Sequence, residues 1–364
     1  MPKKNRTVKI PLIISIALSI SIIVLILYFT IDANTIQTIR NTKIRYEFFA
    51  LAVLLNVIFW IFWGARLKVI ANQLEKGVNL SLKESIKIVL ANMFLANITP
   101  SMAGGEPVRI YLLNKNGMSI GSATAAVIGE RLIDAIFVLI LVPTSFLIFS
   151  RIANLGFLNT ALLIGVFVFI FFLIIFLYAI SKPEKIKKFV IWINKKLSRF
   201  FKGKESETKV IKRINREVDN FHKGMILFKG EGRKTLLKAT FFSALSWSAG
   251  FMIPSMLLIG LGLPPYFIES YAAQVLLLVI IMMPTTPGSS GVAEIGAYGL
   301  YDVLIGASNN LTGVFVLLFR FITYHMNLIV GTVFFYHIFK SVASFSMDKI
   351  KKYERKDELK NTKK

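Results

Sequence analysis

Residues 97–109 read NITPSMAGGEPVR and residues 283–296 read MPTTPGSSGVAEIG, and each stretch interrupts a long apolar segment. Proline and glycine so close together end a helix, because proline lacks the backbone N–H and glycine loses the most conformational entropy. The segments 86–113 and 272–301 are therefore each predicted to be a helix, a turn and a second helix. Non-helical backbone at membrane depth is tolerated only where protein or a water-filled cavity covers it. We expect two re-entrant hairpins that line an interior site.

The composition around these segments is typical of a membrane protein. Of 364 residues, 55% are hydrophobic and 18% are charged, and the mean hydropathy is +0.63. Six uninterrupted apolar runs are long enough to cross the roughly 30 Å hydrocarbon core. They are residues 10–31, 48–64, 123–149, 157–180, 235–261 and 311–339. No small-residue cleavage site follows the first run, so it is expected to be retained as an anchor. The predicted fold is an all-α polytopic membrane protein with six full transmembrane helices and two re-entrant hairpins.

The net charge of +24 lies outside the apolar runs. The excess of Lys and Arg precedes residue 10 or lies in the segment 66–87, the linker 182–234 and the tail 341–364. Six crossings and two hairpins place all of these segments on one side of the membrane. By the positive-inside rule, both termini are predicted to be cytoplasmic, in a multi-pass protein of the cell membrane. A charge distributed in this way is not the footprint of a nucleic-acid-binding protein.

The chain contains an internal repeat. Four matches follow in the same order at offsets of 187 to 189 residues: Trp60 with Trp247, Pro100 with Pro287, Glu106 with Glu294, and Arg131 with Arg320. The first half is residues 1–181, in which the span 157–180 pairs with the second half, and the second half is residues 235–340. On the predicted topology the two halves run in opposite directions. Inverted repeats of this kind are typical of transporter folds.

Charged residues within the apolar segments are the candidate binding residues, because a charge at bilayer depth is costly and usually marks a pathway or a pair. They are Glu106, Arg109, Glu130, Arg131, Asp134, Glu294 and Arg320. The hairpin turns add Pro100, Gly104, Gly105, Pro287, Gly288, Ser290 and Gly291. A guanidinium and a free helix N-terminus both favour a phosphate. The alternatives are that the charges only pair with one another, and that Glu106 and Glu294 only cap their own helices.

The remaining residue types restrict the chemistry. The chain has no cysteine and only three histidines, His222, His325 and His337, whose spacing matches no zinc motif. No nucleophile and base pair or nucleotide-binding loop stands out, so we expect no metal, no cofactor and no catalytic residue. Two apolar stripes in the linker, residues 186–201 and 210–228, predict basic amphipathic helices. These helices suit either an anionic leaflet or packing against other cytoplasmic helices.

The stretches NITPSMAGGEPVRIYLL (97–113), GERLIDAI (129–136) and MPTTPGSSGVAEIGAYGL (283–300) resemble the flippase-like membrane domain of lysylphosphatidylglycerol synthases. The resemblance covers about residues 10 to 340. It implies translocation of an anionic, aminoacylated or polyprenyl-phosphate lipid between leaflets. Only a basic tail follows residue 340 in this sequence, so we expect the stand-alone form of the domain, without synthase activity.

Three functions therefore stay open. The first is a lipid flippase or scramblase with a polar cavity between the two hairpins and with membrane lipids as its partners. The second is a secondary transporter of a small anion or zwitterion, which would use the same inverted hairpins. The third is a membrane scaffold for a separate lipid-modifying or glycosyltransferase enzyme. The sequence does not determine the oligomeric state.

Overall fold

The protein is described by a computed structural model. It covers residues 43–99, 104–152, 207–227, 232–281, 289–306 and 311–336, together with single positions between residues 37 and 40 and between 160 and 192. The predicted span 10–31, most of 157–180, most of the first linker stripe and the tail 341–364 lie outside the described residues. So do the turn residues Pro100, Pro287 and Gly288.

All elements in the described ranges are helical, and four of them are long and apolar enough to cross a membrane. They are α3 (Tyr46–Leu74), α6 (Ile120–Ile152), α10 (Arg233–Gly260) and the run Thr312–Tyr336. This last run begins as α13 (Thr312–Arg320) and continues through a π-helix, η3 (Phe321–His325). The all-helical membrane class is confirmed, whereas the count of six crossings stays a prediction. Helix α3 ends ten residues beyond the predicted span 48–64.

Both interrupted segments have the helix–turn–helix form that was predicted. The first is α4 (Leu82–Asn97) followed by α5 (Gly105–Lys115), and the second is α11 (Phe267–Ile281) followed by α12 (Val292–Ile305). Helix α4 begins at a capping box in which the Ser81 Oγ accepts from the Glu84 N–H at 3.2 Å. Ser81 also donates to the Glu84 carboxylate, and these hydrogen bonds lower the pKa of Glu84.

The two turns are built differently. In the first, Thr99 Oγ1 accepts from the Gly104 N–H at 2.8 Å, and a Cβ added at Gly104 would lie 2.5 Å from the Thr99 methyl carbon. In the second, Gly291 has φ of 92°, a conformation that side chains with a Cβ rarely adopt. Gly104 is therefore required at the first turn because a Cβ would clash with Thr99, and Gly291 is required at the second because of its positive φ.

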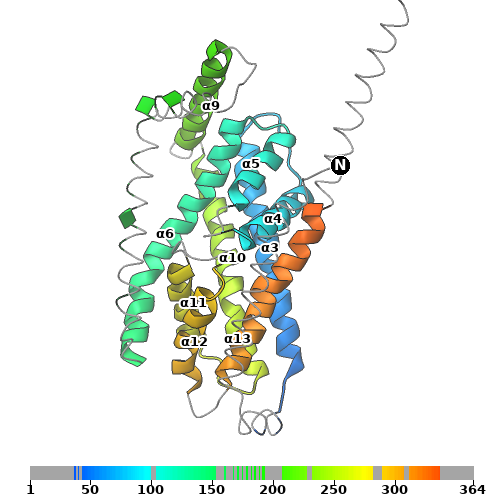
Figure 1. The fold of residues 1–364 in the computed structure, drawn as a ribbon, viewed down its shortest axis with the longest axis vertical. Helices are drawn as coiled ribbons and strands as arrows, with labels where there is room; N and C mark the ends of the chain where they lie inside the picture. The colour runs from blue at the N-terminus through cyan, green and yellow to red at the C-terminus, as the bar shows by residue number, and fades with distance from the viewer. Residues whose placement is uncertain are drawn as a thin grey trace, which may run out of the picture.

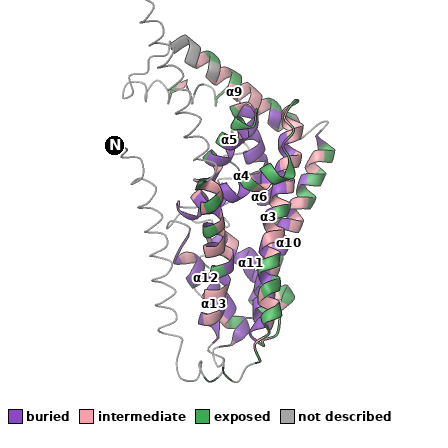
Figure 2. Ribbon diagram, turned by 90° about the vertical axis from the view of Figure 1, so that its right-hand side faces the viewer, coloured by how far each residue is buried: buried purple, intermediate pink, exposed green. Residues whose placement is uncertain are grey.

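The long helices and hairpins are arranged in opposite directions in the two halves. Helix α3 runs upward and α10 runs downward in Figure 1, and among the described helices these two share the most extensive interface. The hairpin α4–α5 lies in the half of the molecule near α9 (Glu207–Leu227), and the hairpin α11–α12 lies in the opposite half, in both views (Figures 1 and 2). This geometry matches the inverted order that the repeat predicted.

The halves are interlaced rather than stacked. The first helix of the second hairpin, α11, packs on α6 through an apolar cluster that includes Val138, Val142, Val275 and Val279. The first helix of the first hairpin, α4, packs on the last long helix described, Thr312–Tyr336, where a Cβ at Gly331 would lie 2.8 Å from the Leu90 carbonyl oxygen. Each half thus completes its core with a helix of the other half.

Helix α9 covers the predicted second stripe of the linker and packs against the start of α6. The Glu217 carboxylate accepts from the Gly121 N–H at 2.8 Å, in the first turn of α6, where backbone N–H groups lack partners within the helix. A Cβ at Gly121 would meet the Glu217 carbonyl oxygen at 2.2 Å. Packing against a neighbouring helix, one of the two expectations for this stripe, is therefore observed.

Candidate functional site

The seven charged residues predicted from the sequence all make ion pairs, and an eighth residue, Arg66, joins them. The set then holds four carboxylates and four guanidinium groups, so its formal charge is zero. The groups divide into two separate Glu–Arg pairs and one central network.

The two separate pairs are related by the repeat. Arg131 Nε donates to Glu106 Oε1 at 2.9 Å, and Arg320 Nε donates to Glu294 Oε1 at 2.9 Å. In each case the glutamate lies in the first turn of the second hairpin helix, and the arginine lies on the long helix that follows. The offsets of 188 and 189 residues seen in the sequence therefore correspond to equivalent contacts in the structure.

The pairs differ in exposure. The side chains of Arg131 and Glu106 are 40% and 26% exposed, whereas those of Arg320 and Glu294 are 5% and 0% exposed. The pair of the first half is therefore accessible in this structure, and its counterpart in the second half is closed.

The glutamates also differ in how they use the second carboxylate oxygen. Glu294 Oε2 accepts from the Gly291 N–H at 2.6 Å and so caps its own helix while it pairs with Arg320. Glu106 Oε1 accepts hydrogen bonds from both Nε and Nη2 of Arg131. Glu106 Oε2 is buried and has no hydrogen-bond partner among the described residues. Glu294 therefore caps its own helix as well as pairing with Arg320, whereas no capping hydrogen bond from Glu106 is present among the described residues.

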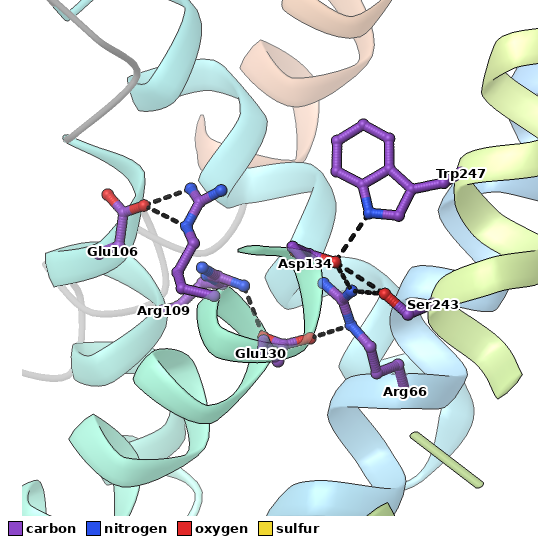
Figure 3. Close-up of polar contacts among 8 residues, drawn as sticks. Arg66, Glu106, Arg109, Glu130, Asp134, Ser243 and Trp247 are labelled. Carbon is purple, nitrogen blue, oxygen red and sulfur yellow. Dashed lines mark hydrogen bonds and ion pairs between the residues drawn. The ribbon is translucent and has the colours of Figure 1, made fainter. Parts of the chain in front are cut away.

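The central network joins four helices (Figure 3). Glu130 on α6 accepts from Arg66 Nε at 2.9 Å and from Arg109 Nη1 at 2.6 Å. Asp134, one turn further along α6, accepts from Arg66 Nη1 at 2.5 Å. It also accepts from Ser243 Oγ and Trp247 Nε1 on α10, each at 2.7 Å. All four ionised groups are at most 7% exposed, so each charge is neutralised by a partner instead of by water.

The position of Arg66 differs from the one predicted for it. The segment 66–87 was expected to be a cytoplasmic loop, because the apolar run ended at residue 64. Helix α3 instead continues to Leu74, and Arg66 is buried within it. The available signal was the imbalance of the predicted set, which held four acids against three bases and so required one more cation.

A second pair of repeat-related contacts holds the halves together. On α3, Asn56 Nδ2 and Trp60 Nε1 donate to Asn327 Oδ1 on the last long helix, Thr312–Tyr336, at 2.9 and 3.1 Å. On α10, Ser243 and Trp247 occupy the equivalent positions, 187 residues later, and donate to Asp134 on α6. Each central helix therefore uses two side chains one turn apart to bind the last long helix of the other half.

The π-helix η3 follows Arg320 directly. Asn56 Nδ2 donates to the Ile322 carbonyl oxygen at 3.0 Å, within this wider turn. One turn after Arg320, the Tyr324 hydroxyl donates to the Asn97 carbonyl oxygen at the end of α4 at 3.3 Å. Single π-turns are frequent at functional sites. Here the π-turn lies where the last long helix contacts both hairpins, through Glu294 and Asn97.

Of the turn residues, Gly104, Gly105, Ser290 and Gly291 lie next to these pairs at the starts of α5 and α12. A Cβ at Gly105 would lie 2.2 Å from Asn92 Oδ1, so this glycine provides space for the Asn92 side chain. Within the described ranges no group of three or more His, Asp and Glu residues could hold a metal ion.

Four long apolar helices and two oppositely placed helical hairpins, with charged pairs at the hairpin helices, define an inverted-repeat membrane protein. The chain belongs to the family described as the lysylphosphatidylglycerol synthase TM region, which matches residues 12–331. The resemblance seen in the hairpin sequences is thereby confirmed.

Relatives of similar length occur in archaea. The chain is similar to a UPF0104 membrane protein of Archaeoglobus fulgidus, with 33% identity over 88% of this chain and 94% of the relative. It is also similar to one of Pyrococcus horikoshii, with 23% identity over 87% and 94%, and to one of Methanocaldococcus jannaschii, with 28% identity over 75% and 79%. These names describe membrane proteins and state no substrate.

Proposed function

We propose that this protein is a lipid translocase of the cell membrane, which moves a lipid with a phosphate headgroup between leaflets. The lipid tails stay in the bilayer while the headgroup passes between the two hairpins. The protein acts by binding and conformational change, without catalysis, and both termini are cytoplasmic. Its partners are anionic, aminoacylated or polyprenyl-phosphate lipids, and a separate lipid-modifying enzyme supplies or uses them.

The observation that carries this proposal is the pair of repeat-related Glu–Arg contacts, one accessible and one closed. A lipid phosphate takes the guanidinium of Arg131 in place of the Glu106 carboxylate, because both ligands offer oxygens to the same fork of N–H groups. When the halves exchange conformations, the Arg320–Glu294 pair opens on the other side. Exchange of one anionic partner for another keeps each guanidinium neutralised throughout, which lowers the cost of moving a charge through the membrane.

The test is reconstitution into liposomes that contain fluorescent phosphatidylglycerol in one leaflet. We expect wild-type protein to move the lipid faster than protein-free vesicles, and Arg131→Ala and Arg320→Ala to reduce the rate. Arg45→Ala is the matched control, since Arg45 forms an exposed ion pair with Glu47 at the start of α3. Equal lipid movement in wild-type and protein-free vesicles would overturn the proposal.

The transporter alternative is distinguished from the translocase by the substrate that crosses the membrane. A labelled soluble anion is added outside vesicles that contain the protein and the fluorescent lipid, under a proton or sodium gradient. Uptake that depends on Glu106 or Glu294, without lipid movement, would favour a transporter of small anions.

A further inference from the structure

Three helices of the first half bring together buried polar atoms that have no hydrogen-bond partner among the described residues. They are Trp63 Nε1 on α3, both amide atoms of Asn92 on α4, and Nε and Nη2 of Arg109 on α5. Buried polar atoms are nearly always hydrogen-bonded, so a group of such exceptions in one region requires an explanation. Asn92 is 1% exposed and Arg109 is 0% exposed, so bulk water does not satisfy them.

These atoms lie around the start of α5. The guanidinium carbon of Arg109 lies 5.5 Å from the centre of the Trp63 ring. The Asn92 side chain lies against Gly105, and Gly105 and Arg109 are four residues apart, which places them on the same face of α5. Arg109 uses Nη1 for Glu130 and keeps its other two nitrogens free. The region is therefore rich in N–H donors, and Gly105 lets the Asn92 side chain lie directly against the backbone of α5.

We infer that Trp63, Asn92 and Arg109 form an internal binding site for a phosphate group. An oxyanion can accept several N–H donors at once, whereas the only acceptor among these free atoms is Asn92 Oδ1. The entrance is the Glu106–Arg131 pair, because Glu106 lies three residues before Arg109 on α5 and this pair is the exposed one. The inference rests on the proposed function, and it adds the residues that hold the phosphate once Arg131 has admitted it.

Two substitutions test the site without removing any observed hydrogen bond. Trp63→Phe deletes only the free indole N–H and part of the ring, and Asn92→Ala deletes an amide that has no partner. Neither variant breaks a hydrogen bond among the described residues, so a loss of stability in Trp63→Phe would come from the lost packing of its ring on Phe59. Trp60→Phe is the matched control, since it makes the same change at an indole whose Nε1 is already bonded to Asn327.

The measurement is calorimetric titration of the detergent-purified protein in phosphate-free buffer with dihexanoyl phosphatidate, with inorganic phosphate and with dihexanoylglycerol. We expect wild type to bind phosphatidate but not dihexanoylglycerol. Trp63→Phe and Asn92→Ala should each weaken this binding about tenfold or more, which corresponds to about 1.4 kcal/mol per tenfold. Trp60→Phe should bind as wild type. If inorganic phosphate binds with the same dependence on the two variants, the site exists and the free ion is also a ligand.

Unchanged affinity in both variants, or no binding of either phosphate compound to wild type, would overturn the site and leave ordered water as the occupant. Binding that depends on Trp63 and Asn92 in a protein that moves no lipid in vesicles would retain the site and overturn the proposed translocase function. The two failures are therefore distinguishable.

Discussion

The repeat-related ion pairs make a direct test of the structure, because the same substitution should have unequal effects in the two halves. Glu294→Gln leaves Arg320 buried and without its counter-ion, and it weakens the cap on the Gly291 N–H. Breaking a buried ion pair by removing one partner costs about 3 to 5 kcal/mol. Glu106→Gln affects a pair that is partly solvated, for which losses are about 0 to 1 kcal/mol. The expected difference is therefore about 3 kcal/mol.

The assay is reversible unfolding in mixed detergent, followed by the fluorescence of the four tryptophans. Glu294→Gln should lower the free energy of unfolding well below that of Glu106→Gln. The double variant Glu294→Leu with Arg320→Met should recover much of the loss, because replacing both partners leaves no buried charge. Equal losses for the two glutamine variants, or a larger loss for Glu106→Gln, would refute the assignment of an open and a closed pair.

Three further predictions concern the packing of the long helices. Asp134→Asn should reduce unfolding free energy by about 3 kcal/mol in the same assay, because Arg66 then shares a single carboxylate with Arg109. Gly121→Ala should release α9, whose Glu217 carbonyl would clash with the new Cβ, and limited trypsin digestion should then cut α9 faster. Gly331→Ala should cost about 1 to 3 kcal/mol of unfolding free energy, since its Cβ meets the backbone of α4. A stability equal to wild type would contradict the close approach of these helices.

Local sequence signals were sufficient for the breaks in the two hairpins and for the repeat. Proline and glycine in 97–109 and 283–296 predicted the breaks between α4 and α5 and between α11 and α12. The repeat offset matched Glu106 with Glu294 and Arg131 with Arg320 before any contact was known. The structure then places each glutamate on its arginine. Such features are predictable because they depend on residue type and spacing along a single chain segment.

The network around Asp134 was not predictable in the same way. The end of an apolar run was taken as the end of a helix at residue 64, but α3 continues because Glu130 and Asp134 neutralise Arg66 inside the protein. The partners Ser243 and Trp247 lie more than 100 residues from Asp134. Contacts of this range follow from the packing of α3, α6 and α10, which no local pattern encodes. The difference in exposure between the two ion pairs likewise arises only from the assembled fold.

The interlacing of the halves has a consequence for how the chain is made. When α6 has been synthesised, Asp134 can form its ion pair with Arg66. Its two other hydrogen-bond donors are on α10, which is synthesised about 100 residues later. The hydrogen bonds of Asn56 and Trp60 form later still, because their acceptor, Asn327, is near the end of the described chain. We therefore expect the first half to be inserted in the membrane with Asn56 and Trp60 on α3 still without their acceptor Asn327, and with Asp134 on α6 bonded to Arg66 alone. Truncation before residue 327 should leave those groups exposed to the quality-control proteases of the membrane.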